Sequence, residues 1–364
     1  MLWLAGSLVL AQGLPYAAPA RLGDGWQLED PAAAGFDAVR LRAIVGKMMD
    51  GSQNFHGVVV VRHGRLVAEA YRTGRDHIVN HLFAHTVTFG PGIRHDVRSV
   101  GKSVIGLLVG IAVGEGRIPS IETPVLDFYP EFPELATAER RAIRLKHLLG
   151  MSSGWAWHEG GAGPDDEHRL MWAWTPVHHP LSRAIVAAPG TTFNYNSGGA
   201  LLAADILSRT TGGPWTEYAR TRLFEPLGIT DVEWIRDFLG RPMAYTGLRM
   251  RPRDMAKLGL LVLNHGRWGG RQVVPAAWID ASLEPRLQTG FDETGYGYFW
   301  WTGKAEWHGR NLAWGAAFGN GSERIFVLPE LDLCVVVTAG AYGDLSAARR
   351  VNAAFREIVT TVDR

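Results

Sequence analysis

The sequence predicts a mixed α/β (α+β) fold, in which an antiparallel sheet flanked by N- and C-terminal helices is interrupted by a mainly helical insertion. Three observations support this prediction. Two β-rich runs lie near the start of the chain, helical patterns dominate its middle, and four further β-rich runs lie near its end. The 364 residues are 46% hydrophobic, which fits one large or two modest globular domains.

The first predicted elements are a helix and a hairpin. Residues 36–49 have the apolar spacing of a helix that covers one face of a sheet. The β-rich runs 57–61 and 66–71 follow, and Arg62-His63-Gly64-Arg65 between them is typical of a hairpin turn.

The middle of the chain predicts helices. Residues 99–115 are apolar nearly all round, which indicates a buried helix. A second apolar helix over 198–210 ends at Gly212-Gly213-Pro214, and a third is expected over 254–264. We expect residues 99–234 to form a mainly helical domain.

The last part of the chain returns to strands separated by Gly, Pro or charged turns. These strands are expected at 296–302, 312–317, 323–328 and 333–338. An amphipathic helix over 345–359 closes the chain. We expect the first hairpin to join these strands in one sheet, so that residues 24–98 and 235–364 form one α/β domain.

The first twenty residues carry no charge and resemble a secretory signal peptide. Residues 2–10 are nearly all apolar, and Ala18-Pro19-Ala20 supplies a small-x-small cleavage site. The apolar stretch is too short to span a bilayer, so no membrane span is expected. The sequence therefore predicts export to the periplasm or the exterior, or a cytoplasmic protein if this segment is not a signal.

Charge and cysteine content exclude several classes of protein. The net charge of +1 offers no electrostatic reason for a nucleic-acid partner. The single cysteine, Cys334, excludes an intrachain disulfide and a multi-cysteine metal site, and its apolar surroundings predict a core residue. The acidic and histidine residues between His158 and His168 lack a metal-ligand spacing and are expected in a solvated loop. The oligomeric state is not evident from the sequence.

Ser99-Val100-Gly101-Lys102 is the first candidate for chemistry. At a helix start, residues three apart share a face, so the Lys102 amine is expected beside the Ser99 hydroxyl. A partly desolvated lysine can accept a proton from serine, whereas arginine cannot, and only five of the 37 basic residues are lysines. An ordinary helix start is the alternative.

The same residues end like a phosphate-binding loop, Gly101-Lys102-Ser103. That motif requires a glycine five residues before Gly101, where this sequence has Asp96. A carboxylate there would repel a phosphate, so we exclude nucleotide binding and expect no organic cofactor.

Two later motifs are weaker in isolation. Tyr195 lies in Asn194-Tyr195-Asn196-Ser197, just before a predicted helix, and can serve as an acid or base if cations lie nearby. The alternative is a helix cap supplied by Asn196 or Ser197. Trp314-Gly315-Ala316-Ala317 lies on a predicted strand along which a substrate could pair, or which is simply tightly packed.

The order of these motifs resembles the serine β-lactamase-related family, which includes class C β-lactamases, DD-peptidases, carboxylesterases of the same fold and 6-aminohexanoate-dimer hydrolases. The resemblance extends from about Phe36 to the C-terminus and implies a β-lactamase/transpeptidase-like fold. It is carried by four segments, which are residues 98–104, 148–154, 189–197 and 224–229.

The resemblance implies a serine hydrolase that works through an acyl-enzyme, without metal or cofactor. Ser99 would attack the carbonyl, while Lys102 and Tyr195 share the general-base role and Tyr195 protonates the leaving group. Which of the two takes the first proton stays open. The backbone N–H groups of Ser99 and Ala317 would form the oxyanion hole.

Two departures from the family pattern bear on the substrate. Ser197 stands where the family has the Asn of Y-x-N, and Trp314-Gly315-Ala316 stands in the K-T-G slot without its lysine. We expect Ser197, Trp314 and Gly315 to contact substrate and a small ester or linear amide to be hydrolysed. β-Lactamase or DD-peptidase activity, or a non-catalytic binding homologue, are the alternatives.

Overall fold

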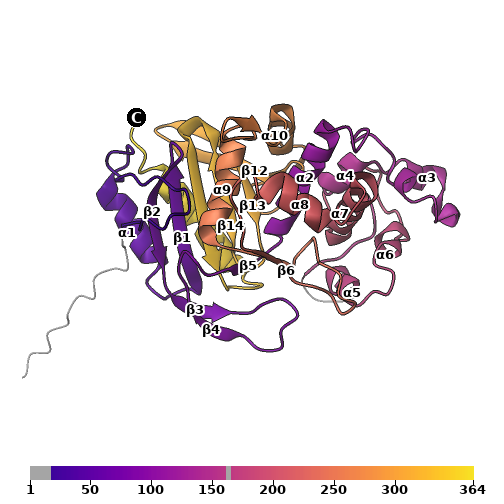
Figure 1. Cartoon of the computed structure of the whole chain (residues 1–364), viewed down its shortest axis with the longest axis horizontal. Coiled ribbons are helices and arrows are strands. Elements are labelled where there is room, and N and C mark those ends of the chain that lie inside the picture. Colours follow the sequence, from indigo (N-terminus) through magenta and orange to yellow (C-terminus); the bar gives the residue numbers. More distant parts are fainter. Residues whose placement is uncertain (1–17, 161–164) are drawn as a thin grey trace, which may run out of the picture.

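The computed structural model describes residues 18–160 and 165–364. A lobe built on a sheet lies beside a helical lobe (Figure 1). All but the last three residues of the expected signal peptide, 1–20, fall outside the described residues. Within the described ranges, every helix is too short or too polar to serve as a membrane span.

The core of the first lobe is an eight-stranded antiparallel sheet in the order β10-β11-β12-β13-β14-β15-β1-β2. Its strands are β1 (Phe55–Arg62), β2 (Arg65–Tyr71), β10 (Leu287–Gln288), β11 (Gly295–Tyr296), β12 (Trp301–Trp307), β13 (Arg310–Phe318), β14 (Arg324–Leu328) and β15 (Leu333–Ala339). The N-terminal hairpin joins the C-terminal strands through β1 and β15, where Val59 faces Val336. The mixed α/β fold predicted from the sequence is therefore confirmed.

The turn of the first hairpin explains its sequence. His63 and Gly64 connect β1 and β2 with φ values of 52° and 69°. Two consecutive residues in the left-handed region match the right-handed twist of the flanking strands. A glycine adopts that conformation without a steric penalty.

Helices cover both faces of this sheet. The helices α1 (Ala38–Met48) and α11 (Leu345–Val359) pack on each other and enclose one apolar core against the sheet. On the other face, α9 (Pro252–Leu263) packs across β1, β14 and β15. Cys334 lies under α9, is fully buried, and is a core residue as predicted.

A small second sheet leads from the first lobe into the helical one. It has the order β5-β7-β6, with β5 at His95–Arg98, β7 at Leu248–Met250 and β6 at Val232–Trp234. The buried helix α2 (Val100–Gly114) begins directly after β5. The expected boundaries between the α/β domain and the helical domain, before residue 99 and after residue 234, stay a prediction.

The helical lobe is built around α2 and α7 (Ser197–Thr211), which pack on each other. Thirteen of the fifteen residues of α2 are buried, as its all-round apolar pattern predicts. The shorter helices are α3 (Ala138–Arg141), α4 (Leu145–Leu149), α5 (Asp166–Met171), α6 (His178–Leu181), α8 (Trp215–Ala219), α10 (Ala276–Leu283), η1 (Val125–Phe128), η2 (Pro133–Leu135), η3 (Arg220–Phe224) and η4 (Pro329–Leu331). Two small hairpins complete the fold, β3 (Thr73–Asp76) with β4 (His85–Thr88) and β8 (Arg267–Trp268) with β9 (Arg271–Gln272).

One predicted strand is wrong in its extent. Residues 296–302 form the end of β11 and the start of β12 rather than a single strand. The chain turns between them, where Phe299 has a φ of 57° and its N–H donates to the Leu149 carbonyl at 2.8 Å. The Phe299 N–H is therefore bonded to the helical lobe, and not to a neighbouring strand as it would be in one continuous strand.

Candidate active site

Ser99 and Lys102 meet at the start of α2. Ser99 is the N-cap residue, and its Oγ accepts a hydrogen bond from Lys102 Nζ at 2.8 Å. The Lys102 side chain is only 1% exposed, whereas Ser99 is partly accessible. The spacing of three residues on a helix places the amine beside the hydroxyl, as the sequence predicts.

A second contact fixes the Lys102 amine. Lys102 Nζ also donates to the Tyr245 carbonyl at 2.8 Å. This contact needs a close approach of α2 to the 244–245 backbone, because a Cβ on Gly101 would lie 3.0 Å from the Ala244 carbonyl oxygen. The glycine within the S-x-x-K motif therefore has a packing reason.

Tyr195 completes the group from the N-terminus of α7. Lys102 Nζ lies 4.9 Å from the centroid of the Tyr195 ring. Asn196 is the N-cap of α7, since its side chain accepts from the Gly199 N–H at 3.0 Å. The cap expected as an alternative therefore exists, and it holds Tyr195 beside Lys102.

The pKa values of the two groups favour their protonated forms. Burial acts to lower the pKa of Lys102, but Tyr195, Glu167 and Glu159 outweigh it, so the pKa lies above that of an ordinary lysine. Burial also raises the pKa of Tyr195, although Lys102 acts to lower it. At neutral pH the basic forms are therefore minor species, and their share grows as the pH rises.

Glu159 enters this site, although the sequence predicted a solvated position for it. Its carboxylate accepts hydrogen bonds from Trp157 Nε1 at 2.7 Å, from Ser197 Oγ at 3.0 Å and from the Ser197 N–H. Burial and the neighbouring Glu167 raise the pKa of Glu159 to about 7, while Lys102 acts to lower it. The sequence signal that could have indicated this role of Glu159 is Ser197, which stands in the Tyr motif where the family has Asn.

Ser197 itself is not a substrate contact in this structure. The residue is fully buried, and its hydroxyl is committed to the Glu159 carboxylate. The first turn of α7 faces inward at this position, so Ser197 holds Glu159 rather than a ligand. The expected contact between Ser197 and substrate is corrected accordingly.

The rest of the expected solvated loop is also partly structural. Asp166 is buried and forms ion pairs with Arg183 at 3.2 Å and with Arg169 at 3.1 Å. Glu167, the next residue, acts electrostatically on Lys102. Within the described part of the chain, no three His, Cys, Asp or Glu side chains converge in a way that would hold a metal ion.

Trp314 and Gly315 do not form the expected substrate surface. Trp314 is 3% exposed and packs beneath α11, with ring centroids 5.6 Å from Phe326 and 6.1 Å from Phe355. A Cβ on Gly315 would lie 2.4 Å from Leu283, so α10 fills that side of the strand. Because side chains alternate along a strand, Trp314 points to the face of the sheet opposite to α2.

Ala317 lies on the other face of β13, within the core that contains α2. The strand and the helix contact each other there. Its N–H and that of Ser99 stay our prediction for the oxyanion hole.

An indole is nevertheless present beside Tyr195, supplied by Trp301 at the start of β12. The Trp301 ring stacks on Tyr195 with centroids 5.9 Å apart, and Trp301 is partly exposed. Further aromatic side chains surround Trp301, namely Phe193, Phe291, Tyr296 and Phe318. Aromatic lining was expected here, but from the neighbouring strand.

Two arginines near the K-T-G slot, Arg310 and Arg324, could replace its missing lysine only if they were free. Both are bonded to other groups. Arg324 is buried under Phe318, and its Nη1 donates to the carbonyls of Gly319 and Glu323 at 3.0 and 2.8 Å. Arg310 pairs with Glu330 at an exposed turn. Both guanidinium groups are therefore committed to partners other than a substrate carboxylate.

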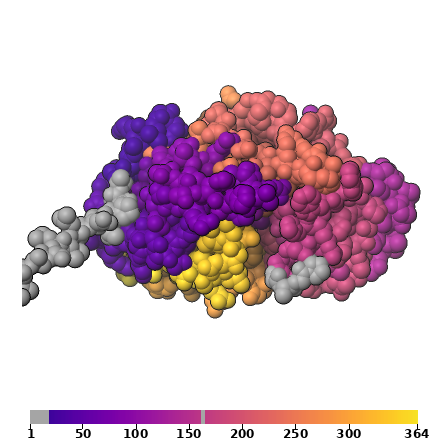
Figure 2. Space-filling view, turned by 90° about the horizontal axis from the view of Figure 1, so that it is seen from below, coloured from indigo at the N-terminus to yellow at the C-terminus, as the bar shows by residue number. Residues whose placement is uncertain are grey.

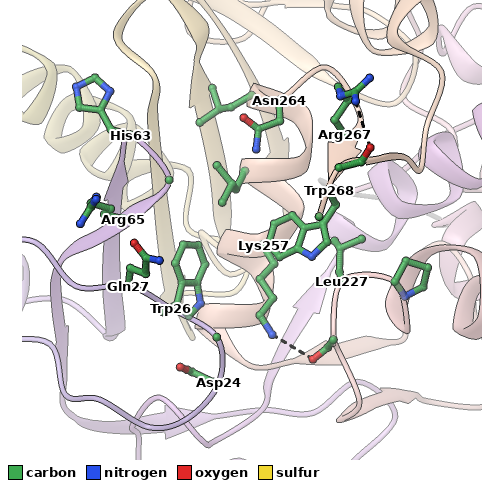
Figure 3. A pocket seen from close by; sticks show the side chains of 18 of the residues that line it. Asp24, Trp26, Gln27, His63, Arg65, Leu227, Lys257, Asn264, Arg267 and Trp268 are labelled. Carbon is green, nitrogen blue, oxygen red and sulfur yellow. Dashed lines mark hydrogen bonds between the residues drawn. The ribbon is translucent and has the colours of Figure 1, made fainter.

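A large surface cavity of about 1220 Å³ lies elsewhere, and none of its lining residues belongs to this group (Figure 3). Trp26 and Trp268 lie on either side of Lys257, whose amine donates to the Gly228 carbonyl at 3.1 Å (Figure 3). Lys257 is also paired with Asp254 at 3.0 Å. The Lys257 amine is therefore bonded to two partners of its own and is separate from the group around Ser99.

The chain is similar to known proteins in sequence and in fold. The profile of the Beta-lactamase family matches residues 41–357. The chain is 27% identical over 337 residues to a 6-aminohexanoate-dimer hydrolase of Paenarthrobacter ureafaciens, covering 83% of this chain and 80% of that protein. Its fold is similar to a family VIII carboxylesterase, with a TM-score of 0.66 at 17% identity, covering 88% of this chain and 97% of that one. It is also similar to a penicillin-binding protein homologue of Caulobacter crescentus, with a TM-score of 0.67 at 17% identity, covering 89% and 96%.

The fold and the match define a serine hydrolase with the β-lactamase/transpeptidase-like architecture. The chain belongs to the Beta-lactamase family.

Proposed function

We propose that this protein hydrolyses small neutral esters or linear amides through an acyl-enzyme formed on Ser99. The observation that carries the proposal is the 2.8 Å hydrogen bond between Ser99 Oγ and the buried Lys102 amine. A serine hydroxyl is a weak nucleophile, and a base within hydrogen-bond distance is what activates it.

In the acylation step, Ser99 Oγ attacks the carbonyl carbon as its proton passes to the Lys102–Tyr195 pair. The backbone N–H groups of Ser99 and Ala317 hold the negative oxygen that develops. The C–O or C–N bond to the leaving group then breaks, and Tyr195 returns the proton to the departing alcohol or amine.

Water completes the cycle. It attacks the acyl carbon, gives its proton to the same pair, and the bond to Ser99 Oγ breaks as the carboxylic acid leaves. Ser99 recovers its proton in that step. Because Lys102 is protonated at rest, acylation at neutral pH proceeds from a minor form of the site.

The surroundings of Ser99 favour a substrate without a carboxylate next to the scissile bond. Glu159 and Glu167 act on Lys102 and would repel a second anion. A charge-assisted hydrogen bond is worth roughly 1.5–3 kcal/mol, about 10- to 150-fold in rate, and Arg310 and Arg324, both bonded to other groups, do not supply it. Trp301 and its aromatic neighbours provide contact for an apolar group instead.

The relatives support this substrate class. One is named a 6-aminohexanoate-dimer hydrolase, and another, 30% identical over 141 residues, is the lovastatin esterase of Penicillium rubens. A linear amide and an ester are thus both represented by name. Esters should be the better substrates, because an alkoxide leaves more readily than an amine.

The test is a panel of short-chain nitrophenyl esters, linear amides, nitrocefin and benzylpenicillin on the purified protein. We expect kcat/KM for the esters to exceed that for the β-lactams by at least about 10²-fold, the size of one lost charge-assisted contact. Ser99→Ala should abolish turnover and labelling by a fluorophosphonate without moving the thermal midpoint. Comparable β-lactam turnover would contradict the substrate class, and activity in Ser99→Ala would contradict the nucleophile.

Export is a separate part of the proposal, and it rests on the apolar residues 2–10 and on Ala18-Pro19-Ala20. N-terminal sequencing of the protein secreted by its native cell would test it. A mature N-terminus near Arg21 is the expected result, and an intact N-terminus in the cytoplasm would contradict it.

A further inference from the structure

We propose that Arg98 is a positioning residue that clamps the strained backbone directly before Ser99 and so fixes the direction of its hydroxyl and N–H. This inference rests on the proposed role of Ser99 as the nucleophile. It is carried by contacts that Arg98 makes with two segments far away in the sequence.

The backbone at Arg98 is strained. Its φ is 48°, in the left-handed region that non-glycine residues rarely occupy. The register of β5 against β7 also shifts between Asp96 and Arg98, as at a β-bulge. This conformation turns the chain from β5 into α2, and it persists only where the surroundings enforce it.

The first of these enforcing contacts is Asp96, which is fully buried. Its Oδ1 accepts from the Arg98 N–H at 3.3 Å, and its Oδ2 lies 3.3 Å from Arg98 Nε. Oδ2 also accepts from the Val79 N–H at 2.6 Å. One carboxylate therefore holds both the backbone and the side chain of Arg98.

Two further contacts hold the guanidinium. Arg98 Nη2 donates to the His77 carbonyl at 2.5 Å, and the guanidinium lies 4.4 Å from the centroid of the Tyr342 ring. The Tyr342 hydroxyl donates to Asp76 at 2.9 Å. These contacts join the segment around β3 and β4 to the segment before α11, which lie side by side on the lower face of the molecule (Figure 2).

The clamp also lies against the end of β13. A Cβ on Gly319 would lie 2.4 Å from the Val97 carbonyl oxygen, so the loop after β13 touches β5. In that loop Glu323 is buried, and burial raises its pKa well above the usual range. Asp96 is the carboxylate within 3.3 Å of Arg98 Nε, so it is the one that pairs directly with Arg98.

Through these contacts Arg98 fixes the backbone directly before Ser99, which helix α2 alone does not do. Ser99 is the next residue after Arg98, so a small rotation of the Arg98 backbone would move both the N–H and the Oγ of Ser99. A displacement of about 1 Å at a reacting group can cost about 10²-fold in rate. The loss should fall on kcat, because Arg98 lies behind the nucleophile and is only slightly exposed.

The test compares Arg98→Ala and Arg98→Gly with Arg310→Ala, which removes an exposed, ion-paired arginine. With the best ester of the panel, both Arg98 variants should lose about 10²-fold in kcat with little change in KM, while Arg310→Ala keeps its kcat. Guanidinium ion at low millimolar concentration should restore part of kcat in the Arg98 variants only. Arg98→Gly should be the more stable of the two, because glycine adopts the positive φ without strain.

Amide hydrogen exchange over residues 95–104 provides a readout that does not depend on turnover. Exchange should be faster in Arg98→Gly than in the wild type and unchanged in Arg310→Ala. If Arg98→Ala does not fold, Asp96→Asn removes the partner charge and should give the same loss of kcat. Wild-type kcat or unchanged exchange in the Arg98 variants would overturn the inference, whereas a wild type inactive on every ester and amide would overturn the proposed function instead.

Discussion

Lys102 shows how a single residue type decides the chemistry of the site. Its amine is buried, bonds to Ser99 and Tyr245, and can lose a proton, whereas a guanidinium at that position cannot. The chain uses arginine almost everywhere else. The lysine at position 102, where the proposed mechanism needs a proton transfer, agrees with the role of Lys102 as a base.

Lys102→Arg should therefore be nearly inactive, with a loss on the order of 10²–10⁴-fold in kcat, the usual range for general acid–base catalysis. Lys257→Arg is the matched control, because Lys257 is also buried and bonds to a backbone carbonyl. That variant should keep its kcat. Steady-state kinetics on one ester would decide, and robust turnover by Lys102→Arg would remove Lys102 from the base role.

Glu159 is one of the groups that shape the pH dependence of the site, after Tyr195 and Glu167. Its carboxylate raises the pKa of Lys102, so the basic form of the site gains population only as the pH rises. Since the pKa of Glu159 is itself about 7, Glu159 becomes an anion over the range in which many hydrolases are assayed.

In Glu159→Gln one of the charges that raise the Lys102 pKa is gone, so that pKa should fall. The rising limb of kcat/KM against pH should then move to lower pH, and a step near pH 7 should disappear. Glu217→Gln, an exposed site paired with Arg220, should leave the profile in place. A limb that stays in place or moves to higher pH in Glu159→Gln would show that Glu159 does not act on the pair.

At the scale of elements, the two tryptophans of neighbouring strands have opposite tasks. Trp301 on β12 stacks on Tyr195, while Trp314 on β13 packs under α11 against Phe355. Only Trp314 was predicted from the sequence to contact substrate. Because Trp301 pairs with Ala316, it lies on the same face of the strands as Trp314, and its position further along the strands is what separates them.

Trp314→Ala should cost roughly 3–5 kcal/mol of unfolding free energy, as for other large aromatic side chains removed from a core, with KM unchanged in the folded fraction. Trp301→Ala should instead raise KM for aromatic esters by about 10-fold, the scale of an aromatic contact. Urea unfolding and ester kinetics on both variants would test this pair. A raised KM in Trp314→Ala alone would reverse the assignment.

For the molecule as a whole, the contact between β1 and β15 joins the two ends of the chain. It places Val59 against Val336, where β1 and β15 pair in the large sheet. The helical lobe is inserted between these two ends and shares its main core with one face of the sheet. We therefore expect the two lobes to unfold together.

Val336→Ala should lower the unfolding free energy by about 2 kcal/mol, because it removes two buried methyl equivalents from that contact. The loss of ester activity, near-UV circular dichroism and far-UV circular dichroism should coincide on heating. Separate transitions for the sheet and for the helical lobe would contradict a shared core.

The sequence by itself determined the elements whose physics is local. The hairpin follows from its turn residues, α2 from its all-round apolar pattern, and α11 from its amphipathic spacing over Leu345–Val359. The pairing of Ser99 with Lys102 was also predictable, because three residues on a helix start share a face.

Only the tertiary structure decided the contacts between segments distant in the chain. The entry of Glu159 into the site depends on α7, the face shown by Trp314 depends on the register of β13, and the strain at Arg98 depends on Asp96, His77 and Tyr342. No local pattern encodes these contacts, because each requires the folded chain to place a partner far away in the sequence against the residue.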